Sequence, residues 1–326
     1  MKNNSIYIII VNFNCWKYTI ACISSLLEST NTNFNIFIVD NNSTDDSVDE
    51  IRNWSDKKLV SNEVVKPEAL ISYLNSKLPV ITIVNGSENK GFGAGNNIIL
   101  KSLLETQYNG FTWLLNPDTE VEPKILEDTL AIAENKERII VGNVIHYFSS
   151  KDKIMYCGGF KVKKFIHGIV DIKKEENIKD LDVIAGASMF THINTYKALG
   201  VLPENYFMYW EETDFCTKAK QASYTFEVNT KSKIFDHVGV TSSGSNFLRE
   251  YLYLLNGLRF YKKYYWFYLP TILMSTIAKY VKALLIEDKI KQKAVFYAHV
   301  DFFKSLFGKN VDVLKRIHSQ KTKIEK

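Results

Sequence analysis

The sequence predicts an α/β fold built on a doubly wound, mostly parallel sheet. Short apolar runs alternate with amphipathic stretches of helical length, and this alternation is typical of βαβ proteins. The apolar runs have few polar interruptions, as expected of parallel strands that are covered on both faces. With 326 residues, of which 46% are apolar, the chain is long enough to bury a full core. We therefore expect one large domain and a smaller appendage.

Five segments are expected to form strands, with helices between them. The first two helices are predicted at residues 16–29 and 43–54, the second with Ser43 or Thr44 as its N-cap. Residues 55–78 read as an insertion. The expected strands are residues 6–11, 36–39, 80–84, 112–115 and 139–144.

Charge and cysteine content limit the classes of function. The net charge is +5, with the basic excess mostly after residue 150. Such an imbalance suits anionic substrates or an anionic membrane face and does not by itself indicate nucleic acid. The cysteines lack CxxC spacing, which argues against a zinc site or a disulfide framework and fits a reducing cytoplasm. The N-terminus passes directly into a strand-like run too short for a signal peptide, so nothing directs secretion.

Two acidic residues stand at predicted strand ends, where open α/β sheets bind ligands. The run Leu114-Leu115-Asn116-Pro117-Asp118 enters a proline turn and delivers Asp118, whose carboxylate suits a hard cation. Asp40 ends the second strand, where a carboxylate accepts hydrogen bonds from a ribose hydroxyl or a base. An Asx turn that caps the next helix explains Asp40 equally well.

A glycine-rich turn at residues 89–97 opens a helix and indicates an anion site. Glycines let backbone N–H groups approach an anion and Lys90 adds positive charge, so a diphosphate would suit this turn. The turn lacks the full G-x-G-x-x-G spacing and follows the third strand, which counts against a dinucleotide oxidoreductase.

Three carboxylates lie within an aromatic frame at residues 207–216. On a helix, Glu211 and Asp214 share a face, while Glu212 projects about 100° away. Burying one carboxylate beside another raises its pKa toward the range of a general base. The alternative is an ordinary solvated helix start. His237 follows a predicted strand, where it either contacts a metal or phosphate or serves only the structure.

Taken in order, these segments resemble glycosyltransferase family 2, the inverting enzymes with the GT-A fold, and most closely its bacterial rhamnosyltransferase-like branch. The resemblance covers about residues 6–264. Any one of its motifs is common, but seven in the same order are specific. The motifs are residues 10–14, 39–43, 89–93, 116–118, 185–187, 211–214 and 236–237.

The resemblance implies a role for each matching residue. Glu212 matches the general base, and Asp118 with His237 would hold a divalent cation, Mg²⁺ or Mn²⁺. The residues expected to bind the acceptor are Glu211, Asp214 and Trp210, and those expected to bind the nucleotide are Asn12, Asn14, Asp40, Asn42, Lys90, Gly91, Asn96 and Asn116.

Two positions depart from the family pattern. The metal motif is often Asp-x-Asp, and Asn116 stands at its first position, so one carboxylate of the motif would contact the cation. The base is Glu where relatives often carry Asp, so its reach is one methylene longer.

The implied reaction moves a sugar from a nucleoside diphosphate, dTDP-rhamnose or a UDP-hexose, to a hydroxyl of a glycan or lipid-linked acceptor. The implied setting is bacterial surface polysaccharide synthesis, such as that of O-antigen. A nucleotidyltransferase usually carries a glycine-rich loop after its first strand, whereas this chain has Val11-Asn12-Phe13-Asn14 there. A non-catalytic nucleotide-sugar-binding scaffold predicts loss of Asp118 or Glu212, and both are present.

Residues 1–240 are expected to form the GT-A catalytic domain, with a nucleotide-sugar half up to about residue 120. Residues 241–326 are expected to form a helical appendage. Its apolar segment at 264–286 contains Pro270 and basic residues, and its uncharged stretch is too short to span a bilayer. It reads either as an interfacial helix on an anionic membrane or as a helix packed on protein. We expect a cytoplasmic protein, peripheral on the inner membrane face in the first case, and the oligomeric state stays open.

Overall fold

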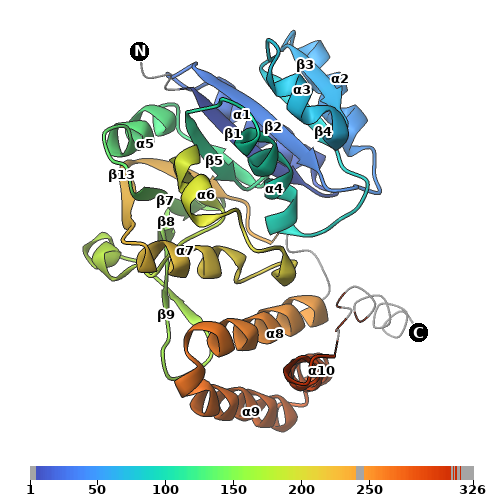
Figure 1. Ribbon diagram of the computed structural model, residues 1–326, viewed down its shortest axis with the longest axis vertical. Helices are drawn as coiled ribbons and strands as arrows, with labels where there is room; N and C mark the ends of the chain where they lie inside the picture. Colours follow the sequence, from blue (N-terminus) through green and yellow to red (C-terminus); the bar gives the residue numbers. More distant parts are fainter. Residues whose placement is uncertain (1–4, 240–245, 310, 312, 314–315, 317–326) are drawn as a thin grey trace. The chain divides into compact units, whose positions relative to one another are not determined.

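The computed structural model describes residues 5–239 and 246–309, together with 311, 313 and 316. It divides into two compact units (Figure 1). The first unit comprises Met1–Lys161, Val170–Phe207 and Glu211–Thr241, and the second comprises Val162–Ile169, Met208–Trp210 and Ser242–Lys326.

A ten-stranded sheet forms the centre of the first unit, and its N-terminal half is parallel as predicted. Strand β1 (Ile6–Asn12) pairs in parallel with β2 (Phe34–Asp40) on one side and with β5 (Phe111–Leu115) on the other. Strands β4 (Ile81–Asn85) and β3 (Asn62–Val65) continue the parallel order beyond β2. The carboxyl ends of these strands therefore share one edge of the sheet.

The other half of the sheet mixes directions. Strand β12 (Ser188–His192) runs antiparallel to both β5 and β7 (Ile139–Tyr147), and β13 (Thr225–Asp236) is parallel to β7. The edge strand β6 (Thr119–Val121) is antiparallel to β13, and β8 (Ser150–Cys157) pairs with β7. A small second sheet contains β9 (Gly159–Val162), β10 (Ile169–Asp171) and β11 (Val183–Ile184).

A buried polar network fixes how the mixed strands pair. The Asn143 Nδ2 group of β7 and the Trp113 indole of β5 both donate to the Ser188 hydroxyl of β12, at 2.8 and 2.9 Å. The Asn143 Oδ1 atom accepts from Thr129 and Asn229. Because buried polar groups are costly without partners, a slip of one residue in any of these strands would be penalised.

The helices of the first unit confirm the alternating pattern, with two differences. Helix α2 begins at Ser47, so the predicted N-cap was wrong: Ser43 instead donates to Asp40, and Thr44 pairs with Asn14. Residues 55–78 contain β3, which was not expected, besides a short helix. The helices are α1 (Trp16–Leu27), α2 (Ser47–Lys57), α3 (Leu70–Leu74), α4 (Phe92–Leu104), α5 (Ile125–Ala133), α6 (Ile193–Leu199) and α7 (Glu211–Gln221).

The second unit is helical, with α8 (Asn246–Tyr264), α9 (Leu269–Leu285) and α10 (Lys289–Leu306). Pro270 lies in the first turn of α9, where its missing N–H costs no hydrogen bond, so it starts the helix and does not break it. No described helix is long and apolar enough to cross a bilayer.

A buried histidine, His167, joins the 163–168 loop to α8 and α9 within the second unit. Its backbone N–H donates to Ser275, and its ring lies among Trp210, Tyr253 and Tyr261. A Cβ atom at position 257 would lie 2.0 Å from its Nε2 atom, so α8 needs Gly257 there. Burial, and after it the charge of Lys279 at 3.2 Å from Nδ1, lowers the pKa of His167 well below its usual value.

This histidine predicts acid sensitivity. An unfolded histidine binds a proton below about pH 6.5, whereas His167 in the folded protein does not. The stability that it contributes is therefore present above that pH and is lost as the pH falls toward the folded pKa. We expect the thermal midpoint of the wild type to drop more steeply from pH 8 to pH 5 than that of His167→Gln. The control His192→Gln changes a half-buried histidine in the first unit and should keep the wild-type slope.

Candidate active site

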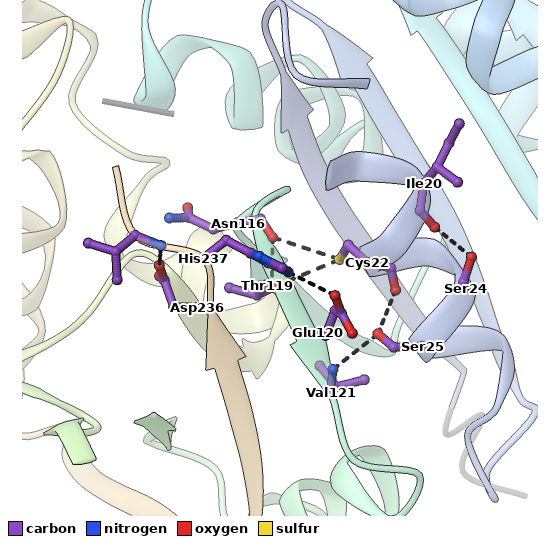
Figure 2. Close-up of polar contacts among 11 residues, drawn as sticks. Ile20, Cys22, Ser24, Ser25, Asn116, Thr119, Glu120, Val121, Asp236 and His237 are labelled. Atoms are coloured by element: carbon purple, nitrogen blue, oxygen red, sulfur yellow. Dashed lines mark hydrogen bonds and ion pairs between the residues drawn. The ribbon is translucent and has the colours of Figure 1, made fainter. Parts of the chain in front are cut away.

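The first part of the site is the junction of β6 and β13. The proline turn after β5 leads to Asp118, whose backbone carbonyl accepts from the His237 N–H at 2.9 Å. One step along the ladder, Thr119 is paired with Asp236. Two segments more than a hundred residues apart in sequence thus bring a pair of buried aspartates to the same strand ends, one of which, Asp236, is drawn in Figure 2.

The two aspartates act on each other. Burial, and after it the negative charge of Asp118, raises the pKa of Asp236. The Val238 N–H, 2.6 Å from the Asp236 carboxylate, opposes this shift. Two buried carboxylates at one place are the donor set that a hard divalent cation needs, with phosphate oxygens and water as further ligands. The described residues contain no cluster of three or more His, Cys, Asp or Glu side chains that would hold a metal by itself.

His237 lies beside this pair and has a partner that was not predicted. Its Nε2 atom is 2.8 Å from the Glu120 carboxylate, and Figure 2 shows the ring turned toward Glu120. The ring also stacks on Phe148, with centroids 3.8 Å apart. When Nε2 carries the proton shared with Glu120, Nδ1 is the nitrogen that keeps a lone pair. A metal-binding role for His237 stays a prediction.

The electrostatics of Tyr156 indicate where the acidic residues gather. Burial, followed in order by the charges of Asp236, Asp118 and Glu212, raises the pKa of this tyrosine well above its usual value. Three carboxylates that were far apart in the sequence therefore lie within electrostatic range of one hydroxyl. Tyr156 belongs to β8 and was not singled out by the sequence.

The acid cluster at 211–214 lies in the first turn of α7, as its spacing predicted. Glu211 and Asp214 are buried, and Asp214 accepts from the Tyr206 hydroxyl at 2.8 Å. Glu212 is half-buried on a different side, and its Cβ would lie 3.7 Å from a Cβ at Gly186. A Cβ at Gly186 would lie closer still to the Phe92 ring, at 3.1 Å, so Phe92, Gly186 and Glu212 pack together.

A strained turn precedes this helix in the chain. Phe207, Tyr209 and Trp210 all have positive φ, between 64° and 78°, which is uncommon for aromatic residues. Trp210 is buried in the second unit and donates from its indole to the Tyr253 carbonyl at 2.8 Å. The acceptor-binding role expected of Trp210 stays a prediction.

The end of β2 has the Asx turn of the structural alternative for Asp40, but this turn does not cap α2, whose N-cap is Asp46. The Asp40 carboxylate accepts from the Ser43 N–H and hydroxyl and from the Asn12 side chain at 2.7 Å. The Asn12 side-chain oxygen Oδ1 in turn accepts from the Thr19 hydroxyl at 2.7 Å. Asp40 and Asn12 are thus fixed in place by each other, and whether they also contact a nucleoside stays a prediction.

The glycine-rich turn is held by an asparagine that the sequence did not single out. Asn41 donates to the Asn89 side chain and to the Gly91 carbonyl, at 3.0 and 3.1 Å. Gly91 has φ +88° and is the N-cap of α4, and a Cβ there would lie 1.8 Å from the Phe207 carbonyl oxygen. The same carbonyl accepts from the Phe92 N–H at 2.9 Å, and residues 93–96 in the first turn of α4 are buried. An anion-binding role for this turn stays a prediction.

The polar residues of the same region differ in their surroundings. Lys90 is exposed and pairs with Glu88 at 3.4 Å, a contact weak enough to be exchanged for an anion. Asn96 is buried in α4, and its Oδ1 atom accepts no hydrogen bond from the described residues. Asn14 and Asn42 are exposed with positive φ, while Asn116 is half-buried and donates its backbone N–H to Ala187.

Comparison with known proteins supports a common reading of these features. The model of the family "Glycosyl transferase family 2" matches residues 7–192. The low-salt glycan biosynthesis hexosyltransferase Agl10 of Haloferax volcanii is 24% identical over 152 residues, which are 43% of this chain and 47% of that protein. This chain thus aligns with about half the length of that relative.

Solved structures share the fold at low sequence identity. A mannosyltransferase, PcManGT from Pyrobaculum calidifontis, in complex with GDP-Man and Mn²⁺, has a TM-score of 0.53 at 14% identity, over 91% of this chain and 86% of that one. GalNAc-T7 with UDP, GalNAc and Mn²⁺ has a TM-score of 0.55 at 12% identity, over 78% of this chain and 51% of that one. TarS 1-349 of S. aureus has a TM-score of 0.51 at 15% identity, over 78% and 64% of the two chains.

The close contact at Gly91 predicts a measurable effect. Gly91→Ala introduces both a strained φ and a clash with the Phe207 carbonyl, whereas Gly200→Ala introduces a similar strain, at φ +80°, with its nearest neighbour at 3.8 Å. We expect Gly91→Ala to cost about 1–3 kcal/mol more than Gly200→Ala in urea unfolding. Hydrogen exchange should also accelerate at residues 89–95 in Gly91→Ala alone. Equal costs for the two variants would contradict this account of the turn.

Proposed function

Because the chain belongs to glycosyltransferase family 2, we propose that it transfers a sugar from a nucleoside diphosphate to a hydroxyl of a glycan or lipid-linked acceptor. The observation that carries the proposal is the pairing of β6 with β13, which brings the buried Asp118 and Asp236 to the same strand ends, with Glu212 in the first turn of α7 as a separate carboxylate. The reaction needs negative charge for a cation at the diphosphate and a separate carboxylate for the proton of the acceptor hydroxyl. These residues supply both.

In this proposal the donor binds along the carboxyl ends of the parallel strands. The Asp40 turn would hold the nucleoside, and the N-terminus of α4 with Lys90 would face the diphosphate. The neighbours PcManGT and GalNAc-T7 were solved with nucleotides and Mn²⁺, which supports a donor of this class.

The buried carboxylates fit a divalent cation, Mg²⁺ or Mn²⁺. Asp118 and Asp236 would hold it, with His237 beside them, and when bound it would neutralise charge on the departing phosphate. The chain's own contribution is to keep two carboxylates together in a buried place, although burial and then the charge of Asp118 raise the pKa of Asp236.

Glu212 would act as the general base. It lies half-buried in the first turn of α7, beside Gly186. Glu211 and Asp214 would orient the acceptor from the same turn. Attack on the face opposite the leaving group inverts the anomeric centre in one displacement.

We infer a donor such as dTDP-rhamnose or a UDP-hexose and a role in bacterial surface polysaccharide synthesis, by resemblance to the rhamnosyltransferase-like branch. Residues 1–240 would form the catalytic domain and residues 241–326 the appendage. We place the protein in the cytoplasm, peripheral on the inner face of the membrane.

The base assignment is tested by Glu212→Gln. The change removes the proton acceptor and preserves the size of the side chain, so turnover should fall by about 10²- to 10⁴-fold while binding of the nucleoside diphosphate, measured by calorimetry, stays unchanged. The control Glu176→Gln alters an exposed glutamate of the same unit and should keep full activity.

The same assay separates the proposal from its alternatives. Release of nucleoside diphosphate from a panel of nucleotide sugars should require a divalent cation and stop with chelator. A scaffold would release none at any cation concentration, and a nucleotidyltransferase would release pyrophosphate from a nucleoside triphosphate and a sugar phosphate. Wild-type turnover in Glu212→Gln would refute the assigned base.

A second expected outcome concerns stereochemistry. A single displacement gives a β-linked product from an α-linked donor, and an α-linked product from a β-linked donor such as dTDP-rhamnose. The one-bond carbon–proton coupling at the anomeric carbon of the product, read by NMR, distinguishes the two configurations for rhamnose as well as for hexoses. A product with the donor's own configuration would rule out the single displacement. It would not contradict the residues proposed to bind the donor.

A further inference from the structure

Helix α9 exposes an apolar face, which a helix of a soluble protein normally buries. The side chains that it buries are Ile272, Thr276 and Ala283, which are few and mostly small or polar. A stripe of larger apolar residues faces outward at intervals of three or four, with Met274, Ile277, Val281, Leu284 and Leu285 between 46% and 80% exposed. We call this the α9 stripe. Such a patch marks a binding surface in most soluble proteins.

Aromatic residues continue the exposed apolar surface at the start of the helix. Trp266 and Phe267, in the 3₁₀ turn directly before α9, are 70% and 74% exposed. The 163–166 loop packs near this turn, because the centroid of the Phe165 ring lies 4.9 Å from that of Tyr268. The backbone N–H of His167, which directly follows the loop, donates to the Ser275 hydroxyl. Phe165 and Ile166 are exposed as well.

The charge of the second unit indicates what covers this surface. Its described residues include fourteen lysines and arginines and four acidic residues. Of those four acids only Glu287 is exposed, while Asp301 is buried and pairs with Arg316. Exposed lysines stand before the aromatic turn, at Lys262 and Lys263, and on α9 at Lys282. A second copy of the chain would bring the same positive charge against this surface, which disfavours self-association.

We propose that the α9 stripe, the aromatic turn 266–267 and the 163–166 loop insert into the headgroup region of a bilayer that contains anionic lipid. Apolar and aromatic side chains enter the boundary of the acyl chains, and the lysines stay at the level of the phosphates. Each lysine near an anionic surface strengthens binding roughly fivefold at low salt. The proposal names the surface through which the protein would lie on the membrane, and the class of lipid that this surface would bind. It rests on the proposed function only in its purpose, which is to keep the enzyme where a lipid-linked acceptor resides.

The test is co-sedimentation of the full chain with vesicles of phosphatidylcholine alone or mixed with phosphatidylglycerol. The variant Met274→Ser/Ile277→Ser/Val281→Ser removes the middle of the stripe, and Lys262→Gln/Lys263→Gln removes charge. We expect wild-type binding to the mixed vesicles that weakens with salt, at least a tenfold loss for the triple variant and about a 25-fold loss for the double variant. The control Leu59→Ser changes a residue of the first unit that is 93% exposed and should bind as the wild type does.

Three results would overturn the proposal: no wild-type binding to the mixed vesicles, equal binding of wild type and triple variant, or equal binding to vesicles with and without phosphatidylglycerol. A wild-type dimer that the triple variant converts to a monomer, without vesicle binding, would assign the stripe to a second copy instead. Turnover with a soluble acceptor, measured on the same samples, shows separately whether the proposed reaction holds and whether each variant is folded.

Discussion

The antiparallel pairing of β6 with the end of β13 is the interaction on which the candidate site depends. It places Asp118 and Asp236 together in a buried position, where burial and then the charge of Asp118 raise the pKa of Asp236. Such an arrangement is costly for a protein without a ligand, and it persists because the strands around it are fixed by other contacts. The network of Asn143, Ser188 and Trp113 is one of these. Where a fold keeps a locally destabilising arrangement, that arrangement usually belongs to a functional site.

Much of the fold was predictable because its signals are local. Continuous apolar runs marked the parallel strands, and the spacing of Glu211 and Asp214 marked a helix face, which α7 confirms. The start of α2 was wrong because Ser43 and Thr44 bond backward to Asp40 and Asn14, a competition that a capping rule does not include. Strand β3 was missed because its four residues are mixed in polarity and form a strand by pairing with β4, which the local sequence does not indicate.

The site was harder to predict because its contacts are distant in sequence. Asp236 lies in a motif of the resemblance but had no assigned role, and the contacts of Glu120 and Tyr156 with the site became visible only in the structure. The spacing Asp118-x-Glu120 was a readable signal, since residues two apart in an extended chain share a side. Asn41 had no such signal, because its partners Asn89 and Gly91 follow almost fifty residues later.

The turn before α7 ties the acidic cluster to the helical appendage through the chain itself. Three aromatic residues there hold backbone angles that cost on the order of 1–3 kcal/mol each. The Asn256 amide of α8 donates to the Met208 carbonyl at 2.8 Å, and the Tyr253 carbonyl holds the Trp210 indole. A recombinant version that stopped before α8 would retain Asp118, Asp236 and Glu212, yet the contacts of Met208 and Trp210 with α8 would be lost. Trimming the C-terminus to obtain a minimal catalytic core would therefore risk an ordered but inactive protein.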